Sequence, residues 1–262
     1  YSLQHYTVLT VAVGLTFTML ALLLRVFTKV YILRDMQVED YLLISSGAGL
    51  VAFSAVLVDS GRSGQGTHQW NLTIEQLQQI LNLSNVIEVI YCPVMLMAKL
   101  SVLFQLNRIF VVSRTTLIYW LTQVLIGGNI CCYLSLALAL GLSCIPRAKL
   151  WDPELPGHCI SSTSSIIASS VINIVSDVTI LILPVFAVWQ LQLPVKSKLI
   201  VSAAFGSGIF ASASSIIRLV YSIQLTHTQD FSWGIEPVGL WAIAEISTVI
   251  LAGSIPILPK FV

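Results

Sequence analysis

The sequence predicts an all-α membrane protein, a bundle of seven transmembrane helices with its N-terminus outside. Of its 262 residues, 56% are hydrophobic and 10% are charged, whereas a soluble domain carries about 25% charged residues. Seven segments are apolar over roughly 20 residues, the length that crosses about 30 Å of hydrocarbon. Lysine and arginine are concentrated on one side of these segments, as in membrane proteins of fixed orientation. Because lipid tolerates no unpaired backbone groups, the segments are expected to be helices rather than strands.

Three apolar runs predict the first three helices, and the third run is the least apolar. The first centres on VAVGLTFTMLALLL and extends over residues 7–33, and the second covers residues 38–59. The third, over residues 80–110, is the least apolar because it contains Glu88 and Lys99. Each run reaches the roughly 20 residues that a spanning helix needs.

Four further apolar runs complete the predicted bundle. None of the runs shows the alternation over roughly ten residues that is typical of outer-membrane barrels. Residues 1–262 are therefore expected to form a single seven-helix domain. Because the chain begins at Tyr1 rather than Met and ends at Val262, we expect that tails have been trimmed. The last four helices are expected over residues 116–142, 165–193, 199–225 and 236–258.

The orientation follows from the positive residues, which favour the cytoplasmic side of a membrane. With the N-terminus outside, only Arg62, Arg147 and Lys149 face outward, while Lys99 and Arg218 lie within helices. All other lysines and arginines then fall on the cytoplasmic side, as the rule requires. They are Arg25, Lys29, Arg34, Arg108, Arg114, Lys196, Lys198 and Lys260.

Two features of the outer loops fit this orientation. Asn71 begins an N-glycosylation sequence in the loop after the second helix, and we expect it to carry a glycan. A second such sequence, at Asn82, abuts the membrane and is expected to stay unmodified. Cys144 and Cys159 lie in the loop between the fourth and fifth helices, where disulfides persist. We favour a disulfide between them, and two free thiols are the alternative.

The glycine-rich loop GRSGQGTHQW, residues 61–70, raises the question of nucleotide binding. A dinucleotide site needs its G-x-G between a strand and a helix N-terminus, but Gly64 and Gly66 follow a transmembrane helix. We expect a tight outer turn in which these glycines adopt positive φ and Trp70 lies at the membrane interface. A contact of His68 with a ligand is the alternative. The outer-loop histidines lack the short spacing of a metal site, so no metal is expected. A net charge of +1 without a basic patch excludes a nucleic-acid partner.

Ionisable residues inside the membrane are costly and indicate function by default. At a rise of 1.5 Å per residue, Glu88, Arg218 and Glu245 lie in an outer layer. Lys99 and Asp177 lie in a deeper layer by the same measure. Each layer thus contains charges of both signs.

Opposite charges are expected to pair within each layer. Asn173 lies one turn before Asp177 and is expected to hydrogen-bond into the deeper layer. The resulting network either fixes the register of the helices or forms a ligand pocket in the outer layer, and both interpretations remain open. The expected pairs are Arg218 with Glu245 or Glu88, and Lys99 with Asp177 or Asp40.

Taken in order, these residues resemble the fungal rhodopsin-like integral membrane domain family, which includes the Pth-type receptor-like proteins. The strongest match is Lys99-Leu100-Ser101 followed by Arg108-Ile109-Phe110, and Glu39 departs from the family's Asp-Asp pair at the second helix. The other matching positions are Arg25, Arg34, Asp40, Tyr41, Gly64, Gln65, Gly66, Thr67, His68, Cys144, Pro146, Trp151, Asp152, Gly157, Cys159, Asn173, Asp177, Pro184, Leu191, Lys198, Arg218, Trp241, Glu245 and Pro256.

The resemblance implies a receptor-like signalling protein that spans the plasma membrane several times and binds an extracellular or membrane ligand. Its cytoplasmic loops, or a C-terminal tail, would engage a signalling partner. Retinal is not expected, because the seventh helix offers Glu245 where a retinal protein needs lysine, and no other cofactor is expected.

Two other functions remain open. A membrane-embedded enzyme could use the intramembrane carboxylates to move protons on a lipid or terpenoid. A transporter is the third choice, because the sequence lacks internal repetition and paired broken helices. We expect a binding protein rather than an enzyme.

Overall fold

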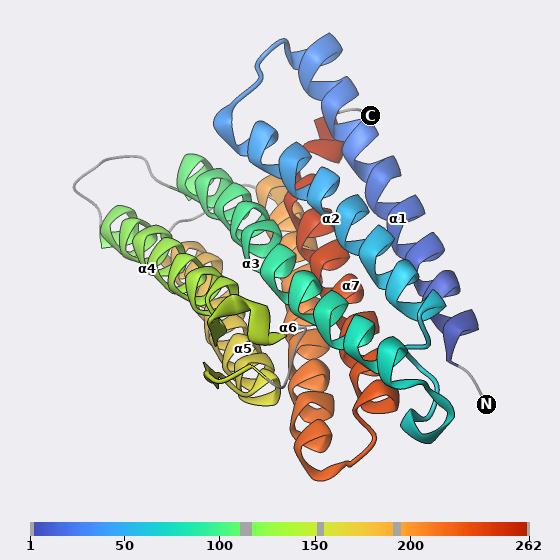
Figure 1. Ribbon diagram of the computed structural model, residues 1–262. Coiled ribbons are helices and arrows are strands. Elements are labelled where there is room, and N and C mark those ends of the chain that lie inside the picture. The colour runs from blue at the N-terminus through green and yellow to red at the C-terminus, as the bar shows by residue number, and fades with distance from the viewer. Residues whose placement is uncertain (1–2, 111–116, 151–154, 191–194, 261–262) are drawn as a thin grey trace.

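Seven helices long and apolar enough to cross a membrane run side by side in the computed structural model (Figure 1). The structure describes residues 3–110, 117–150, 155–190 and 195–260. The predicted all-α, seven-helix class is confirmed. Arg114, Trp151, Asp152 and Leu191, which entered the sequence analysis, lie outside the described residues. The helices are α1 (Gln4–Phe27), α2 (Val38–Arg62), α3 (Ile74–Phe110), α4 (Leu117–Gly141), α5 (Ser162–Gln190), α6 (Val195–His227) and α7 (Phe231–Ser254).

Short elements extend or connect the long helices. α1 continues as the π-helix η1 (Thr28–Leu33), and α7 continues as the 3₁₀ helix η4 (Ile255–Lys260). Two further 3₁₀ helices, η2 (Gln69–Asn71) and η3 (Arg147–Leu150), lie in connecting loops. The only strands among the described residues are β1 (Cys144–Ile145) and β2 (His158–Cys159).

α3 begins at Ile74, earlier than the predicted start at residue 80. Its first turns contain Glu75 and three glutamines, so the apolar run begins several residues after the start of the helix. Thr73 and Gln76 hold this end: the Gln76 amide donates to Thr73 Oγ1 at 3.3 Å, and the Thr73 amide donates to Gln76 Oε1 at 3.0 Å. Such a reciprocal pair satisfies amides that an N-terminal turn leaves free.

α3 and α7 occupy the centre of the bundle. α3 packs against α2, α4, α5 and α7, whereas α7 packs against α1, α2, α3 and α6. α1 and α4 lie at the margin and expose large apolar side chains such as Leu23, Trp120 and Leu138. Polar groups on the two central helices are therefore shielded, while the outer surfaces are suited to lipid.

Glycines allow the central helices to approach their neighbours closely. A Cβ atom on Gly49 of α2 would lie 2.4 Å from Val94 Cγ2 of α3. A Cβ atom on Gly239 of α7 would lie 2.8 Å from Leu57 Cδ1 of α2. Because association in lipid depends on van der Waals packing, small residues at such contacts stabilise the bundle.

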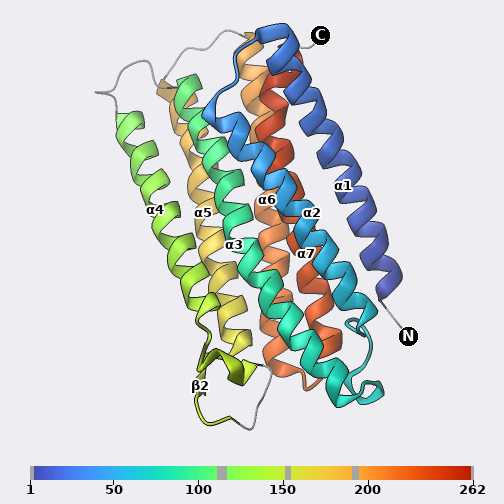
Figure 2. The same ribbon diagram turned by 45° about the horizontal axis from the view of Figure 1, so that its top comes forward.

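The two ends of the bundle are clearly separated (Figure 2). The N-terminus lies at the same end as the α2–α3 connection, the β1–β2 hairpin and the α6–α7 connection, and we call this the outer end after the predicted orientation. The C-terminus and the turn after η1 lie at the opposite, inner end. Successive connections thus alternate between the two ends, and the termini lie at opposite ends, as seven consecutive spans require.

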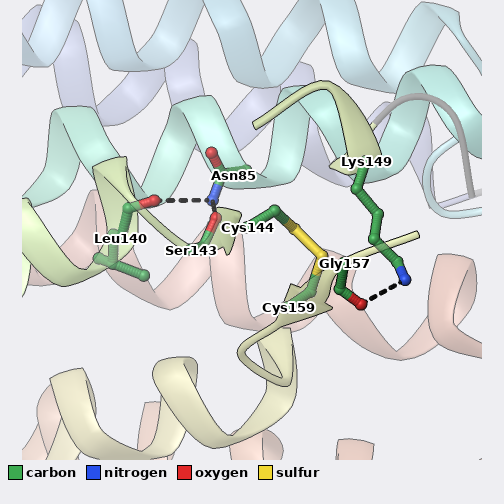
Figure 3. Close-up of a disulfide and its surroundings, with 7 residues drawn as sticks. All are labelled: Asn85, Leu140, Ser143, Cys144, Lys149, Gly157 and Cys159. Atoms are coloured by element: carbon green, nitrogen blue, oxygen red, sulfur yellow. Dashed lines mark hydrogen bonds between the residues drawn. A yellow bond between two sulfur atoms is a disulfide. The ribbon is translucent and has the colours of Figure 1, made fainter. Parts of the chain in front are cut away.

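A disulfide between Cys144 and Cys159 closes the hairpin that follows α4 (Figure 3). The two cysteines are paired residues of β1 and β2, which run antiparallel. Lys149 Nζ donates to the carbonyl of Gly157 at 2.7 Å across the same loop. Of the two alternatives that the sequence left open, the structure therefore contains the disulfide.

Buried charges join α1 to α2 at the inner end. Arg25 donates to Asp40 Oδ1 from Nε at 2.8 Å and from Nη2 at 2.6 Å. Lys29 Nζ lies 3.1 Å from Asp40 Oδ2, and Arg25 also donates to the carbonyl of Gly253. Both carboxylate oxygens of Asp40 therefore have cationic partners on α1 and η1, and Asp40 is not the partner of Lys99. Arg25 and Lys29, counted as cytoplasmic from the sequence, are buried among these partners.

Candidate functional site

Eight polar side chains from five helices meet in the interior of the bundle, and we call them the core polar cluster. Most are nearly inaccessible, and Asn173, Ser215 and Glu245 are 0% exposed. Burying such groups is unfavourable unless they are paired and hydrogen-bonded. The cluster comprises Tyr91 and Lys99 of α3, Tyr133 of α4, Asn173 and Asp177 of α5, Ser215 and Arg218 of α6, and Glu245 of α7.

An ion pair between Arg218 and Glu245 forms the outer part of the cluster. Arg218 Nε lies 2.9 Å from Glu245 Oε2, without the alignment of a hydrogen bond. Tyr91 links the two, because its hydroxyl accepts from Arg218 Nη2 at 2.9 Å and donates to Glu245 Oε2 at 3.0 Å. The guanidinium carbon also lies 4.5 Å from the centre of the Tyr91 ring. Of the two partners expected for Arg218, the structure pairs it with Glu245 rather than Glu88.

The deeper part of the cluster is built on Lys99 and Asp177. Lys99 Nζ lies 2.7 Å from Asp177 Oδ1 and donates to the carbonyl of Asn173 at 3.1 Å. It also lies 5.5 Å from the ring centre of Tyr133, whose hydroxyl donates to Asn173 Oδ1. The ammonium thus has anionic, carbonyl and aromatic neighbours, which together compensate its removal from water.

The two charge layers expected from the sequence form one connected cluster. The side-chain amide of Asn173 donates to Asp177 Oδ2 at 3.1 Å and to Glu245 Oε1. Ser215 lies between the same carboxylates, with Oγ 2.6 Å from Asp177 Oδ2 and in contact with Glu245 Oε1. Residues on α5, α6 and α7 are therefore coupled through shared acceptors.

An outer cavity of about 40 Å³ adjoins the cluster. Its walls are mainly apolar, with Phe53 and Leu57 among them, and its polar lining includes Glu88, Tyr91 and Arg218. A water molecule needs roughly 10–15 Å³ measured in this way, so the space holds a few water-sized groups. Glu88 lines this cavity and belongs to neither ion pair.

A second cavity, of about 70 Å³, lies on the inner side of the cluster. Lys99 and Asp177 form its polar part, and Val102, Phe205 and Val249 are among its apolar walls. The cluster thus separates two cavities, with one ion pair bordering each. A group bound in either cavity would be next to a charge that belongs to the shared network.

The glycine-rich loop has the expected backbone but makes mainly structural contacts. Gly64 and Gly66 have φ values of 110° and 79°. The Gly66 amide donates to the carbonyl of Ser232 at 3.0 Å, and its own carbonyl accepts from the Leu3 amide at 3.1 Å. Between the glycines, Gln65 is 1% exposed, and its side-chain amide donates to Glu236 Oε2 of α7. The loop therefore joins α1 to α7 at the outer end.

His68 is held by an acid and two aromatic rings. Its Nδ1 lies 2.6 Å from Asp230 Oδ2, and its ring is stacked between Trp70 at 4.4 Å and Trp233 at 4.3 Å. Both faces of the imidazole are covered by tryptophan. Within the described part of the chain, no group of three or more His, Cys, Asp or Glu side chains is arranged to hold a metal ion.

The motif with the strongest family resemblance connects three helices. Lys99 reaches α5, and Ser101 donates to the carbonyl of Glu39 at 2.7 Å. Arg108 lies 3.3 Å from Glu39 Oε1 and 2.7 Å from Asp35 Oδ2. Hydrogen bonds from Arg108 and then Gln37 hold the pKa of the Asp35 carboxyl below its ordinary value. The motif thus anchors α3 to the start of α2 at the inner end.

Sequence reasoning did not include Tyr91, Tyr133 or Ser215 in the site. Tyr91 follows Glu88 by three residues and Ser215 precedes Arg218 by three, so helical spacing places each beside a charged residue. A search restricted to residues that are charged at neutral pH passes over both. Nothing in the sequence near Tyr133 marks it as a partner of α5.

Comparison with known proteins identifies relatives of this bundle. A family model described as the fungal rhodopsin domain matches residues 24–262. The chain is 35% identical to the SAT4 family membrane protein of Emericella nidulans, over 80% of this chain and 53% of that protein. No solved structure matches the chain.

Two further relatives have names that refer to biosynthesis. Fugralins biosynthesis cluster protein 2 of Gibberella zeae is 28% identical, over 97% of this chain and 64% of that protein. Polyenoic acids biosynthesis gene cluster protein Ba17b of Metarhizium anisopliae is 24% identical, over 95% of this chain and 72% of that protein. The chain thus spans between half and two thirds of the first two relatives.

Proposed function

The chain belongs to the fungal rhodopsin domain family, and on this premise we propose that it is a receptor-like protein that binds a small molecule in its outer cavity. The bound molecule would alter the core polar cluster and thereby the inner end of the bundle. In this proposal the protein lies in the plasma membrane, and its inner end engages a cytoplasmic signalling partner.

One observation carries the proposal: the outer cavity and the inner cavity border opposite sides of a single buried network. Arg218 lines the outer cavity and pairs with Glu245, while Lys99 lines the inner cavity and pairs with Asp177. Asn173 bonds to both carboxylates. A ligand that weakens the pair between Arg218 and Glu245 therefore changes the acceptors available to Asn173, and with them the environment of Lys99.

The size of the outer cavity bears on the mechanism. At about 40 Å³ it is far smaller than the 300–1,000 Å³ of sites for larger organic ligands. A ligand with more than a few heavy atoms would therefore select a state in which α6 and α7 are further apart. A ligand that binds one of two states better than the other shifts their populations, which is how such a bundle would signal.

The test uses a fungal strain that lacks the full-length protein and is complemented with variants of matched surface level. We expect an extract of the surface on which the fungus grows, used as the cue, to change cAMP or calcium in cells with the wild type and with Arg62→Gln, whose side chain is exposed. Cells with Arg218→Gln should not respond. An equal response in the uncomplemented strain would rule out the receptor role.

A second candidate function, a membrane-embedded enzyme, is favoured by the names of two relatives. Glu88, Asp177 and Glu245 would supply or accept protons next to an apolar substrate in this case. Lipid extracts from cells with wild type and with Glu245→Gln should then differ in one specific product. Identical extracts, together with a cue response that depends on Arg218, would favour the receptor.

A further inference from the structure

We propose that the outer cavity is a site for an organic cation, a lipophilic amine, with the Glu88 carboxylate as its counter-ion. This inference rests on the proposed function and assigns the chemical class of its ligand. Glu88 is half-buried on α3, one turn before Tyr91.

Neither salt bridge of the site includes Glu88, although the Arg218 guanidinium attracts its carboxylate from across the outer cavity. Arg218 is paired with Glu245, and Lys99 is paired with Asp177. Within the described residues, no ion pair or hydrogen bond involves the carboxylate of Glu88. The site therefore contains three carboxyl groups and two cations, so Glu88 is neutralised either by a proton or by a bound cation. An unpaired carboxylate in an apolar environment is strongly disfavoured.

Glu88 also lines a smaller cavity, of about 10 Å³, beneath the disulfide-closed hairpin. This small cavity and the outer cavity have Ser84 and Glu88 in common. Asn85 and Ser143 also line it, close to the end of α4 (Figure 3). The two hollows thus flank the Glu88 carboxylate, one toward the core polar cluster and one toward the outer end.

Unsatisfied polar atoms beside Glu88 are of the type that an ammonium requires. Ser84 Oγ and Asn85 Oδ1 are buried and have no hydrogen-bond partner within the described residues. Ser84 lines both cavities, whereas Asn85 lines only the small one. Each can accept a hydrogen bond, as can the Glu88 carboxylate, and an ammonium group offers three donors. Buried groups of this kind normally have a partner, so their lack of one indicates a missing donor.

The rest of the cavity selects against other ligand classes. A carboxylate would face the charge of Glu88, and the guanidinium that could attract it already belongs to Glu245. An alcohol has one donor and no charge, so it would satisfy a single acceptor. The apolar wall formed by residues such as Ile87 and Val238 favours an organic chain over a hydrated metal ion.

The test compares three probes of equal chain length on the purified protein in detergent at neutral pH: n-hexylamine, 1-hexanol and hexanoate. The readout is the midpoint of thermal unfolding. At about ten times its dissociation constant, hexylamine should raise the midpoint by about 3 °C more than hexanol does. Hexanoate should give no rise. Hexyltrimethylammonium, which lacks N–H donors, should give a smaller rise than hexylamine.

Variants separate specific binding from effects on the micelle. Glu88→Gln should abolish the difference between hexylamine and hexanol, and Ser84→Ala should reduce it. Glu75→Gln, an exposed position near the start of the same helix, should retain it. If Glu88→Gln does not fold, Ser84→Ala and Asn85→Ala together serve as the test. Equal effects of amine and alcohol on the wild type, or an amine effect that survives in Glu88→Gln, would overturn the proposal.

A failure of the cation site can be distinguished from a failure of the receptor function. A Glu88-dependent effect of hexylamine in a protein that gives no cellular response leaves the cation site intact and removes the signalling function. A normal response to the cue in cells with Glu88→Gln would keep the signalling function and remove the cation site from it.

Discussion

Lys99 Nζ of α3 lies 2.7 Å from Asp177 Oδ1 of α5, and both side chains are almost completely buried. The two helices are joined here deep within the bundle, next to the inner cavity. Removing two charges from water is costly, and their attraction repays that cost only when further hydrogen bonds complete the site. Asn173 and Ser215 provide these hydrogen bonds, and the ring of Tyr133 adds a cation–π contact with Lys99.

This geometry predicts that each partner is harmful without the other. Lys99→Met or Asp177→Leu alone should lower the free energy of unfolding by about 3–5 kcal/mol, because an unpaired buried charge remains. The double variant should recover much of that loss. Thermal unfolding in detergent measures all three. A double variant whose loss equals the sum of the single losses would mean that the two residues do not interact.

The pair formed by Arg218 and Glu245 predicts the outcome of charge reversal. Arg218→Glu and Glu245→Arg each bring like charges together in a buried site, and the loss of stability should reduce the amount at the cell surface several-fold. The combined reversal should restore part of that amount. Recovery should be incomplete because Glu245 also accepts from Asn173. Arg62→Glu, at an exposed position, is the control for added negative charge.

The Cys144–Cys159 disulfide predicts sensitivity to reduction at the outer end. With a sequence separation of 15, its loss should lower the free energy of unfolding by about 3 kcal/mol. Cys159→Ser should therefore unfold at a lower temperature than the wild type, and a reductant should abolish the difference. Cys131→Ser, which replaces an exposed free cysteine of α4, should behave as the wild type. If reductant leaves the wild-type midpoint unchanged, the disulfide does not contribute.

The contact between Gly49 and Val94 predicts a steric effect. A methyl group at Gly49 would lie 2.4 Å from Val94 Cγ2, and a valine in a helix has little rotamer freedom. Gly49→Ala should therefore cost about 1–3 kcal/mol, and adding Val94→Ala should relieve it. Gly127→Ala provides the matched control, because a Cβ atom there meets nothing within 4 Å. Since helix propensity alone favours alanine over glycine, a loss in Gly127→Ala as large as in Gly49→Ala would assign the effect to membrane insertion instead of the contact with Val94.

The seven helices could be predicted because the signal for a membrane span is long and compositional. Each span extends over more than twenty residues, so a few polar residues do not hide it. The start of α3 was missed because Glu75 and Gln76 belong to a helical turn beyond the apolar run. The sequence marks where lipid contact ends, and a helix can continue past that point.

The core polar cluster was only partly predictable. Residue rise along a helix placed Arg218 and Glu245 at a similar depth, but rise alone does not say which way a helix is turned. The choice of Glu245 over Glu88 therefore needed the structure. The link through Asn173 also needed it, because one amide reaches carboxylates on two helices. Asp40 was left open beside Asp177 as a partner of Lys99, because Arg25, its partner in the structure, was counted among the cytoplasmic residues.

The outer end carries a test of the predicted orientation. Asn71 is exposed in η2, whereas Asn82 lies within α3 with Oδ1 buried. In a eukaryotic host we expect glycosylation at Asn71 alone, because an acceptor asparagine must be accessible on the luminal side of the membrane. Asn71→Gln should therefore remove the change in electrophoretic mobility that follows glycosidase treatment, and Asn82→Gln should not.

Thr73 requires a careful control in that experiment, because its hydroxyl both completes the glycosylation sequence and accepts from the Gln76 amide at the start of α3. Thr73→Ser keeps both functions and should retain the glycan, while Asn71→Gln leaves the α3 cap untouched. A glycan that persists in Asn71→Gln and disappears in Asn82→Gln would mean that the first turns of α3 are open during synthesis. A wild type without any glycan would contradict the prediction. Labelling of Gln69→Cys from the cytoplasmic side would then show that the bundle has the opposite orientation.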